Sequence, residues 1–63
     1  MYTIRRWEGK NGTMYEIEGP GGTWNVKHDK AVEIIREELG YRDAGDAETI
    51  VYNAQQSRHP YEF

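Results

Sequence analysis

The strongest constraint on the fold is a change of hydrophobic period near Lys27. Before it, apolar and polar residues alternate over 13–18 and 23–27. A period of two places one face of a strand in a core and the other in water. After it, four apolar residues recur on one helical stripe opposite charged residues: Ala31, Val32, Ile35 and Leu39, with Ile34 at the edge. The pattern predicts two strands and then a helix over about 30–39.

Turn-forming residues separate the extended segments. Gly9-Lys10-Asn11-Gly12 follows a further strand candidate over about 2–8, and Gly19-Pro20-Gly21-Gly22 connects the next pair. Gly, Pro and Asn-Gly supply the backbone conformations that tight turns need. Closing each turn over its four residues places Ile4 opposite Ile17 and Ile17 opposite Trp24. A two-residue Asn11-Gly12 loop would shift the first register by two and keep the same faces. We therefore expect a three-stranded antiparallel meander.

The strand period also assigns the two faces of this sheet. The helix must cover the apolar face, because a meander alone is not stable in water; that face carries Tyr2, Ile4, Tyr15, Ile17, Trp24 and Val26. The other face carries Thr3, Arg5, Trp7, Met14, Glu16, Glu18, Thr23, Asn25 and Lys27. We expect Trp7 and Met14 to be covered by the tail or by a second subunit.

Helix ends are marked by residue type. Asp29 is the expected N-cap of the helix, and Gly40 is its expected stop. A loop from Tyr41 to Asp46 then leads to a second short helix over about 47–57, with Asp46 as its cap.

The second helix has an alternative. Thr49-Ile50-Val51-Tyr52 is rich in strand formers, which favours a fourth β-strand over about 48–53. Pro60 ends any helix, and the aromatic residues of the tail indicate that it docks against the body. Either way the prediction is an α+β fold in a single small domain over 1–63.

Composition limits the chemistry available. The chain has no Cys, its histidines are His28 and His59, and its acidic residues fall on predicted surface. Ser57 and His59 are two apart in the tail and do not suit a catalytic triad. We expect no enzyme activity, no cofactor and no metal site. The longest apolar runs are too short for a membrane span or a signal peptide, so a cytoplasmic protein without membrane contact is expected.

Charge gives the first functional hypothesis. The net charge of −3 arises within 30–48, where an acidic surface is formed by Glu33, Glu37, Asp43, Asp46 and Glu48. Such a surface would dock on a protein with a basic site. In size, lack of Cys and acidity the chain is similar to small phage-type inhibitors, such as anti-CRISPR or anti-restriction proteins. That likeness is one of physical type and implies binding to the basic site of a host nucleic-acid enzyme.

The predicted sheet suggests two other functional hypotheses. Arg5, Trp7, Met14 and Lys27 share a face that could stack and track a single-stranded nucleic acid. Nucleic acid is nevertheless an unlikely partner, because acidic residues share this face and the net charge repels phosphate. The third hypothesis is a homo-oligomer, formed through the Trp7–Met14 face or an exposed strand edge.

Overall fold

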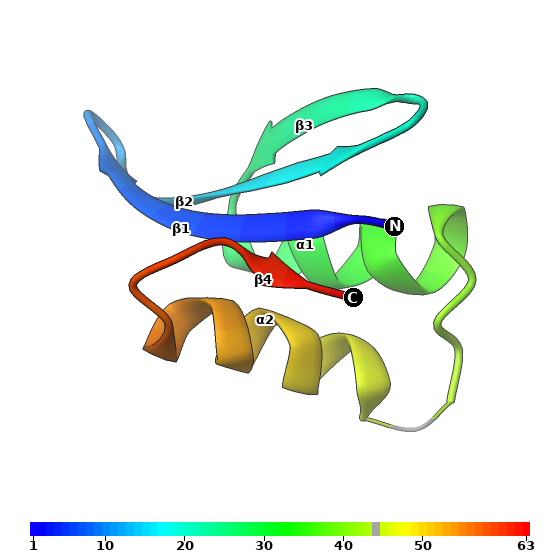
Figure 1. The fold of residues 1–63 in the computed structure, drawn as a ribbon. Coiled ribbons are helices and arrows are strands. Elements are labelled where there is room, and N and C mark those ends of the chain that lie inside the picture. The colour runs from blue at the N-terminus through cyan, green and yellow to red at the C-terminus, as the bar shows by residue number, and fades with distance from the viewer. Residues whose placement is uncertain (44) are drawn as a thin grey trace.

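A four-stranded antiparallel sheet carries all the helices on one of its faces (Figure 1). The computed structural model describes residues 1–43 and 45–63. The strand order is β3-β2-β1-β4, with β1 at Thr3–Gly9, β2 at Gly12–Gly19, β3 at Gly22–Val26 and β4 at Tyr61–Glu62. The helices are α1 at His28–Glu33, the π-helix η1 at Ile34–Glu38 and α2 at Asp46–Gln56. The predicted α+β class is confirmed.

The predicted meander is also confirmed, and the first hairpin has the four-residue register of the two considered. Ile4 lies opposite Ile17, and Ile17 lies opposite Trp24. The core combines the helix-facing side of the sheet with the inner sides of the helices; its buried members are Ile4, Tyr15, Ile17, Ala31, Ile34, Ile35, Ala47, Ile50, Val51 and Ala54. The faces therefore separate as the period of two requires.

The first helix begins earlier than predicted. Lys27 occupies the N-cap position with extended backbone, and the first helical hydrogen bond runs from the Ala31 N–H to the Lys27 carbonyl over 2.9 Å. Asp29 is therefore in the first turn, and its prediction as N-cap is wrong. The cause is that the chain turns directly after β3, so Asp29 is already helical. Its carboxylate lies 3.2 Å from His28 Nδ1.

The same helix ends in a wider turn than the predicted α-helix. The Leu39 N–H bonds to the Ile34 carbonyl over 3.1 Å, a spacing of five residues. The wider turn buries both Ile34 and Ile35, whereas Val32 and Leu39 are partly buried. Ile34 is thus more central than its predicted edge position. Gly40 has φ +83° and ends the helix as predicted.

The second helix forms where it was predicted, and the alternative strand over 48–53 does not form. Residues 46–56 are helical because Ala47, Ile50, Val51 and Ala54 make a buried stripe. The prediction of Asp46 as the cap is wrong. Gly45 is the N-cap with φ +82°, which places Asp46 inside the first turn. The predicted loop from 41 to 46 contains Ala44, which lies outside the described residues.

The fourth strand comes from the tail. Tyr2 and Phe63 exchange both backbone hydrogen bonds, over 3.1 and 2.9 Å, and Tyr61 lies opposite Ile4. The Phe63 ring stacks on Tyr2 with centroids 5.7 Å apart and meets the edge of Tyr41 at 5.5 Å. The predicted docking of the tail is confirmed. Because these rings pack on the core side, the tail does not cover Trp7 and Met14, and the expectation that the tail covers them is wrong. Cover by a second subunit stays a prediction.

Candidate interaction surfaces

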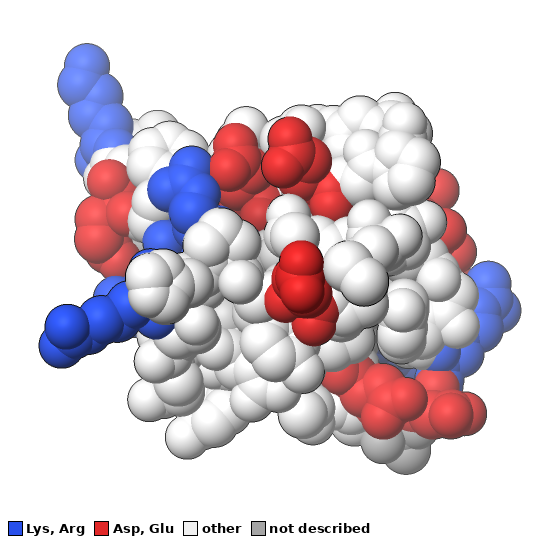
Figure 2. All heavy atoms as spheres, in the orientation of Figure 1, with Lys and Arg blue, Asp and Glu red and all other residues white. Residues whose placement is uncertain are grey.

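The acidic surface is exposed in all its members and is spread over both helical segments. Glu33 ends α1, Glu37 is in η1, Asp43 precedes α2, and Asp46 and Glu48 are in its first turn. Figure 2 shows acidic groups gathered at the lower right, where Figure 1 places the start of α2. Basic groups lie near the β1–β2 turn, where acidic groups lie beside them, and a further basic group lies at the right. The charges of residues 1–29 cancel, so the net negative charge belongs to residues 30–48.

Neighbouring cations neutralise part of the acidic surface. Lys30 Nζ lies 2.7 Å from Glu33 Oε2, and Arg42 Nη2 lies 4.0 Å from Glu37 Oε1. The hydrogen bond to Glu33, together with the charge of that carboxylate, raises the pKa of Lys30 above its usual value. Among residues 1–43 and 45–63, no ion pair involves the other three acidic residues: Asp43, Asp46 and Glu48. The uncompensated charge is therefore centred on the start of α2.

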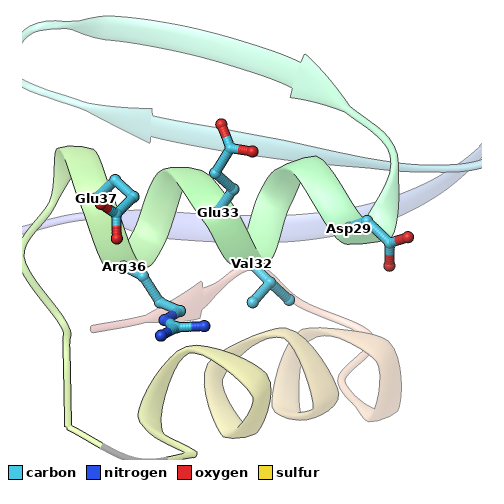
Figure 3. Close-up of a pocket in the computed structure, with 5 residues that line it drawn as sticks. All are labelled: Asp29, Val32, Glu33, Arg36 and Glu37. Atoms are coloured by element: carbon cyan, nitrogen blue, oxygen red, sulfur yellow. The ribbon is translucent and has the colours of Figure 1, made fainter.

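A shallow depression lies along the solvent side of α1 and η1 (Figure 3). Its lining side chains diverge: Glu33 points toward β3, whereas Val32 and Arg36 point toward α2. Glu37 sits at the end of the helix nearest the start of α2. The structure thus brings Glu37 toward the acidic residues of α2 and turns Glu33 away from them.

Three residues of this depression were not among the predicted site residues: Asp29, Val32 and Arg36. The sequence predicts Val32 on the buried stripe of the helix and Asp29 as its N-cap. The helical period could place them on adjoining faces, but it could not show that Val32 would remain partly exposed on the side of the helix that also carries Arg36. The depression offers an apolar contact within a charged rim.

The second candidate surface is the outer sheet face, defined by the predicted residues Arg5, Trp7, Met14 and Lys27. The register places Met14 opposite Trp7 and Arg5 opposite Glu16. All helices lie on the opposite side of the sheet, so this face has no covering element among the described residues (Figure 1). The structure therefore brings these predicted residues together on one open face.

Polar contacts already occupy the groups that would bind a nucleic acid there. Arg5 Nη2 donates to Glu16 Oε1 over 2.9 Å, and the Trp7 indole N–H donates to Asn25 Oδ1 over 3.3 Å. The Lys27 ammonium donates to the Asn11 carbonyl. Phosphate binding would have to compete with these partners, so the arrangement does not favour the nucleic-acid hypothesis.

The neighbours of His28 and His59 are an adjacent carboxylate, an aromatic ring and a local backbone turn. His28 is beside Asp29 and meets the edge of the Tyr15 ring at 6.0 Å. In the tail, Ser57 Oγ donates to the His59 carbonyl over 2.7 Å and accepts from the His59 N–H over 3.2 Å. This is a local turn in which the imidazole takes no part. Across residues 1–43 and 45–63, no cluster of three or more His, Asp or Glu is arranged to hold a metal ion.

Comparison of the chain with protein-family models, with curated proteins and with solved structures finds no match. In the described parts of the chain, no helix is long and apolar enough to cross a membrane.

Proposed function

We propose that this protein is a non-enzymatic binding module whose acidic surface docks on the basic, nucleic-acid-binding site of a partner protein. The observation that carries the proposal is the location of the charge. The whole net charge of −3 comes from residues 30–48, and the charged side chains of this range are exposed on α1, η1, the segment after η1 and the start of α2. A field concentrated in this way accelerates association with a surface of opposite sign.

The interior supports a binding role over a catalytic one. Within residues 1–43 and 45–63, no polar or charged residue is buried. Catalytic acids and bases usually depend on desolvation to shift their pKa values. The pKa of Lys30 is raised by its exposed ion pair with Glu33, whereas burial in a cleft would lower it. The exposed charged side chains of this protein are therefore suited to contact with the surface of a partner protein.

The test is a charge reversal at the least neutralised part of the acidic surface. The double variant Asp43→Lys/Glu48→Lys should slow association with a panel of purified nucleic-acid enzymes, measured by surface plasmon resonance at several salt concentrations. We expect the association rate of any bound enzyme to fall by about tenfold or more. An oligonucleotide that fills the enzyme's own site should compete with the wild-type protein.

The matched control is Glu18→Lys/Glu62→Lys, which changes the net charge equally at exposed positions on β2 and β4. Circular dichroism establishes that both variants are folded. The proposal requires that the control retain more of the association rate than the acidic-surface variant. Equal losses would show that only total charge matters, and binding unaffected by oligonucleotide would rule out docking at the nucleic-acid site.

A further inference from the structure

The two edges of the sheet differ in how well they are protected against pairing with another chain. On the β1 side, β4 pairs with Thr3 and Ile4, and the remaining edge carries the charged residues Arg6 and Glu8. On the other side, β3 is the edge strand, and its sequence G-T-W-N-V contains no charged residue. Native proteins usually cover an edge strand or place charges on it, since its free backbone groups can pair with another chain. By this criterion β3 is the unprotected edge of the sheet in the part of the chain that the structure describes.

Hydrogen-bond alternation identifies the free groups on β3. Tyr2 exchanges backbone bonds with Phe63, so the next residue, Thr3, directs its groups to β2. The registers carry this alternation across β2 and direct the groups of Trp24 to β2. Thr23 and Asn25 therefore direct their backbone N–H and C=O groups away from the sheet. Each offers a donor and an acceptor to a new strand.

Side chains along this edge are also suited to pairing. Thr23 and Asn25 are exposed on the outer side, whereas Trp24 is half-buried and packs against the core on the helix side. A strand added here would leave the core unchanged and would cover more of the Trp24 ring. Burial of this aromatic surface would add to the gain from the backbone bonds.

We propose that β3 pairs antiparallel with β3 of a second copy of this chain, with Trp24 of each copy facing the other across a two-fold axis. In this register Thr23 lies opposite Asn25 of the second copy, so the outward groups on both strands meet and form hydrogen bonds. Trp24 then occupies a non-hydrogen-bonded position, where cross-strand side chains are closest. The contact is isologous and closes at two copies.

A second copy fits this edge because the sequence is self-complementary in that register. Val26 lies opposite Gly22, which has no side chain, and Lys27 lies opposite Gly21. No like charges meet directly, although each copy carries a net charge of −3. Pairing through the outer sheet face would instead bury the Arg5–Glu16 ion pair, which costs desolvation energy. The edge is the more favourable route to a dimer.

This inference goes beyond the proposed function and does not depend on it. The two-fold axis is perpendicular to the joined sheets, so the helices of both copies lie on the same side. A dimer would therefore present two acidic surfaces in one direction. Binding through both at once would raise the apparent affinity without new contacts.

The test is the mass of the full chain by analytical ultracentrifugation from micromolar to millimolar concentration. We expect a monomer–dimer equilibrium, with slow exchange of the Thr23 and Asn25 amide protons at high concentration. Thr23→Pro removes an outward donor while leaving the β2–β3 hydrogen bonds, and it should weaken dimerisation by about tenfold or more. The matched control Thr3→Lys on β1 should leave the dimer unchanged, whereas Thr23→Lys should disrupt it.

Several results would overturn the proposal. A monomer at millimolar concentration would exclude the dimer. A dimer that survives Thr23→Pro and Thr23→Lys but is lost in Met14→Lys would assign self-association to the outer sheet face. Circular dichroism and a retained β2–β3 pattern of amide exchange would show that each variant is folded. Protection of the Thr23 and Asn25 amides only when an extended peptide is added would replace the second copy by a peptide partner.

Discussion

The ring of Tyr2 lies directly over Gly19. A Cβ atom placed on Gly19 would be 2.2 Å from Tyr2 Cδ1 and 2.5 Å from Cε1, closer than atoms can approach. Tyr2 is in turn stacked on Phe63, which belongs to the tail. The absence of a side chain at Gly19 therefore allows Tyr2 to occupy the position in which it holds β4 to the sheet.

We predict that Gly19→Ala destabilises the protein by about 1–3 kcal/mol, because the Tyr2 ring must move and its stack on Phe63 is disturbed. Urea unfolding followed by tryptophan fluorescence measures the change. Gly21→Ala is the matched control, since no atom of residues 1–43 and 45–63 lies within 4 Å of the Cβ it would add. Equal stabilities for the two variants would contradict the proposed role of this close approach.

The wide turn of η1 gives a second prediction. Ile34 is 3% exposed, whereas Val32 is only partly buried, which is the reverse of the order expected from a regular α-helix. Ile34→Ala should cost about 2–4 kcal/mol through loss of buried surface and formation of a cavity. Val32→Ala should cost about 1 kcal/mol or less, because its side chain is already partly in water.

Thermal unfolding of the two variants measures this order. Each variant serves as the control for the other, since both changes remove an apolar side chain and lie two residues apart, in α1 and in η1. A larger loss for Val32→Ala than for Ile34→Ala would show that the helix keeps the α-helical register in solution.

The alternating pattern was sufficient to predict the meander. The face on which residues such as Ile17 and Trp24 lie follows directly from parity, and their pairing follows from the length of the second turn. In the first hairpin two turn lengths were open, and both gave the same faces. The π turn could not be predicted in this way. It depends on fitting both Ile34 and Ile35 against the sheet, which is a tertiary effect that the helical period does not contain.

The predicted helix caps were wrong for a local reason, whereas the position of the fourth strand depends on tertiary pairing. Asp29 and Asp46 have the composition of caps, but the backbone at Lys27 and Gly45 starts each helix before them. The strand at Tyr61–Glu62 has only two residues and follows a proline, so it has no period to recognise. Tertiary pairing with β1 creates it.

The sequence predicted which residues form the acidic surface, but it did not predict how they lie relative to one another. Net charge by segment identified the acidic residues, and their exposure follows from their charge. Their separation depends on how α1 and α2 are oriented, which places Glu37 near the start of α2 and turns Glu33 toward β3 (Figure 3). Sequence spacing alone grouped Glu33 and Glu37 as neighbours one turn apart.

The tail provides a third prediction. Phe63 contacts the rings of both Tyr2 and Tyr41, so Phe63→Ala removes two aromatic pairs that join β1, β4 and the segment after η1. We expect a loss of about 2 kcal/mol in the free energy of unfolding, together with faster exchange of the Tyr2 amide proton. Hydrogen exchange followed by NMR measures both effects.

The control for the tail is Glu62→Gln, a change at an exposed neighbouring residue that leaves both rings in place. Its stability should stay close to that of the wild type. If Phe63→Ala also retained the wild-type stability and the same Tyr2 exchange rate, the docked tail would contribute nothing measurable.

A fourth prediction concerns the ion pair between Lys30 and Glu33, whose nitrogen and oxygen are 2.7 Å apart. The hydrogen bond and the negative charge of Glu33 raise the pKa of Lys30, and Glu38 adds a smaller effect of the same sign. A raised lysine pKa means that the folded state holds the proton more tightly. Its stabilising contribution is therefore complete below the unfolded value of 10.5 and is lost as pH rises through the folded pKa.

An NMR titration of the Lys30 side chain in the wild type and in Glu33→Gln measures this effect. The midpoint should move to lower pH in the variant, because the first cause of the raised pKa has been removed. High salt should reduce the difference, since this exposed pair is screened by solvent ions. An unchanged midpoint in Glu33→Gln would mean that the pair does not persist in solution, and Glu33 would then contribute its full charge to the acidic surface.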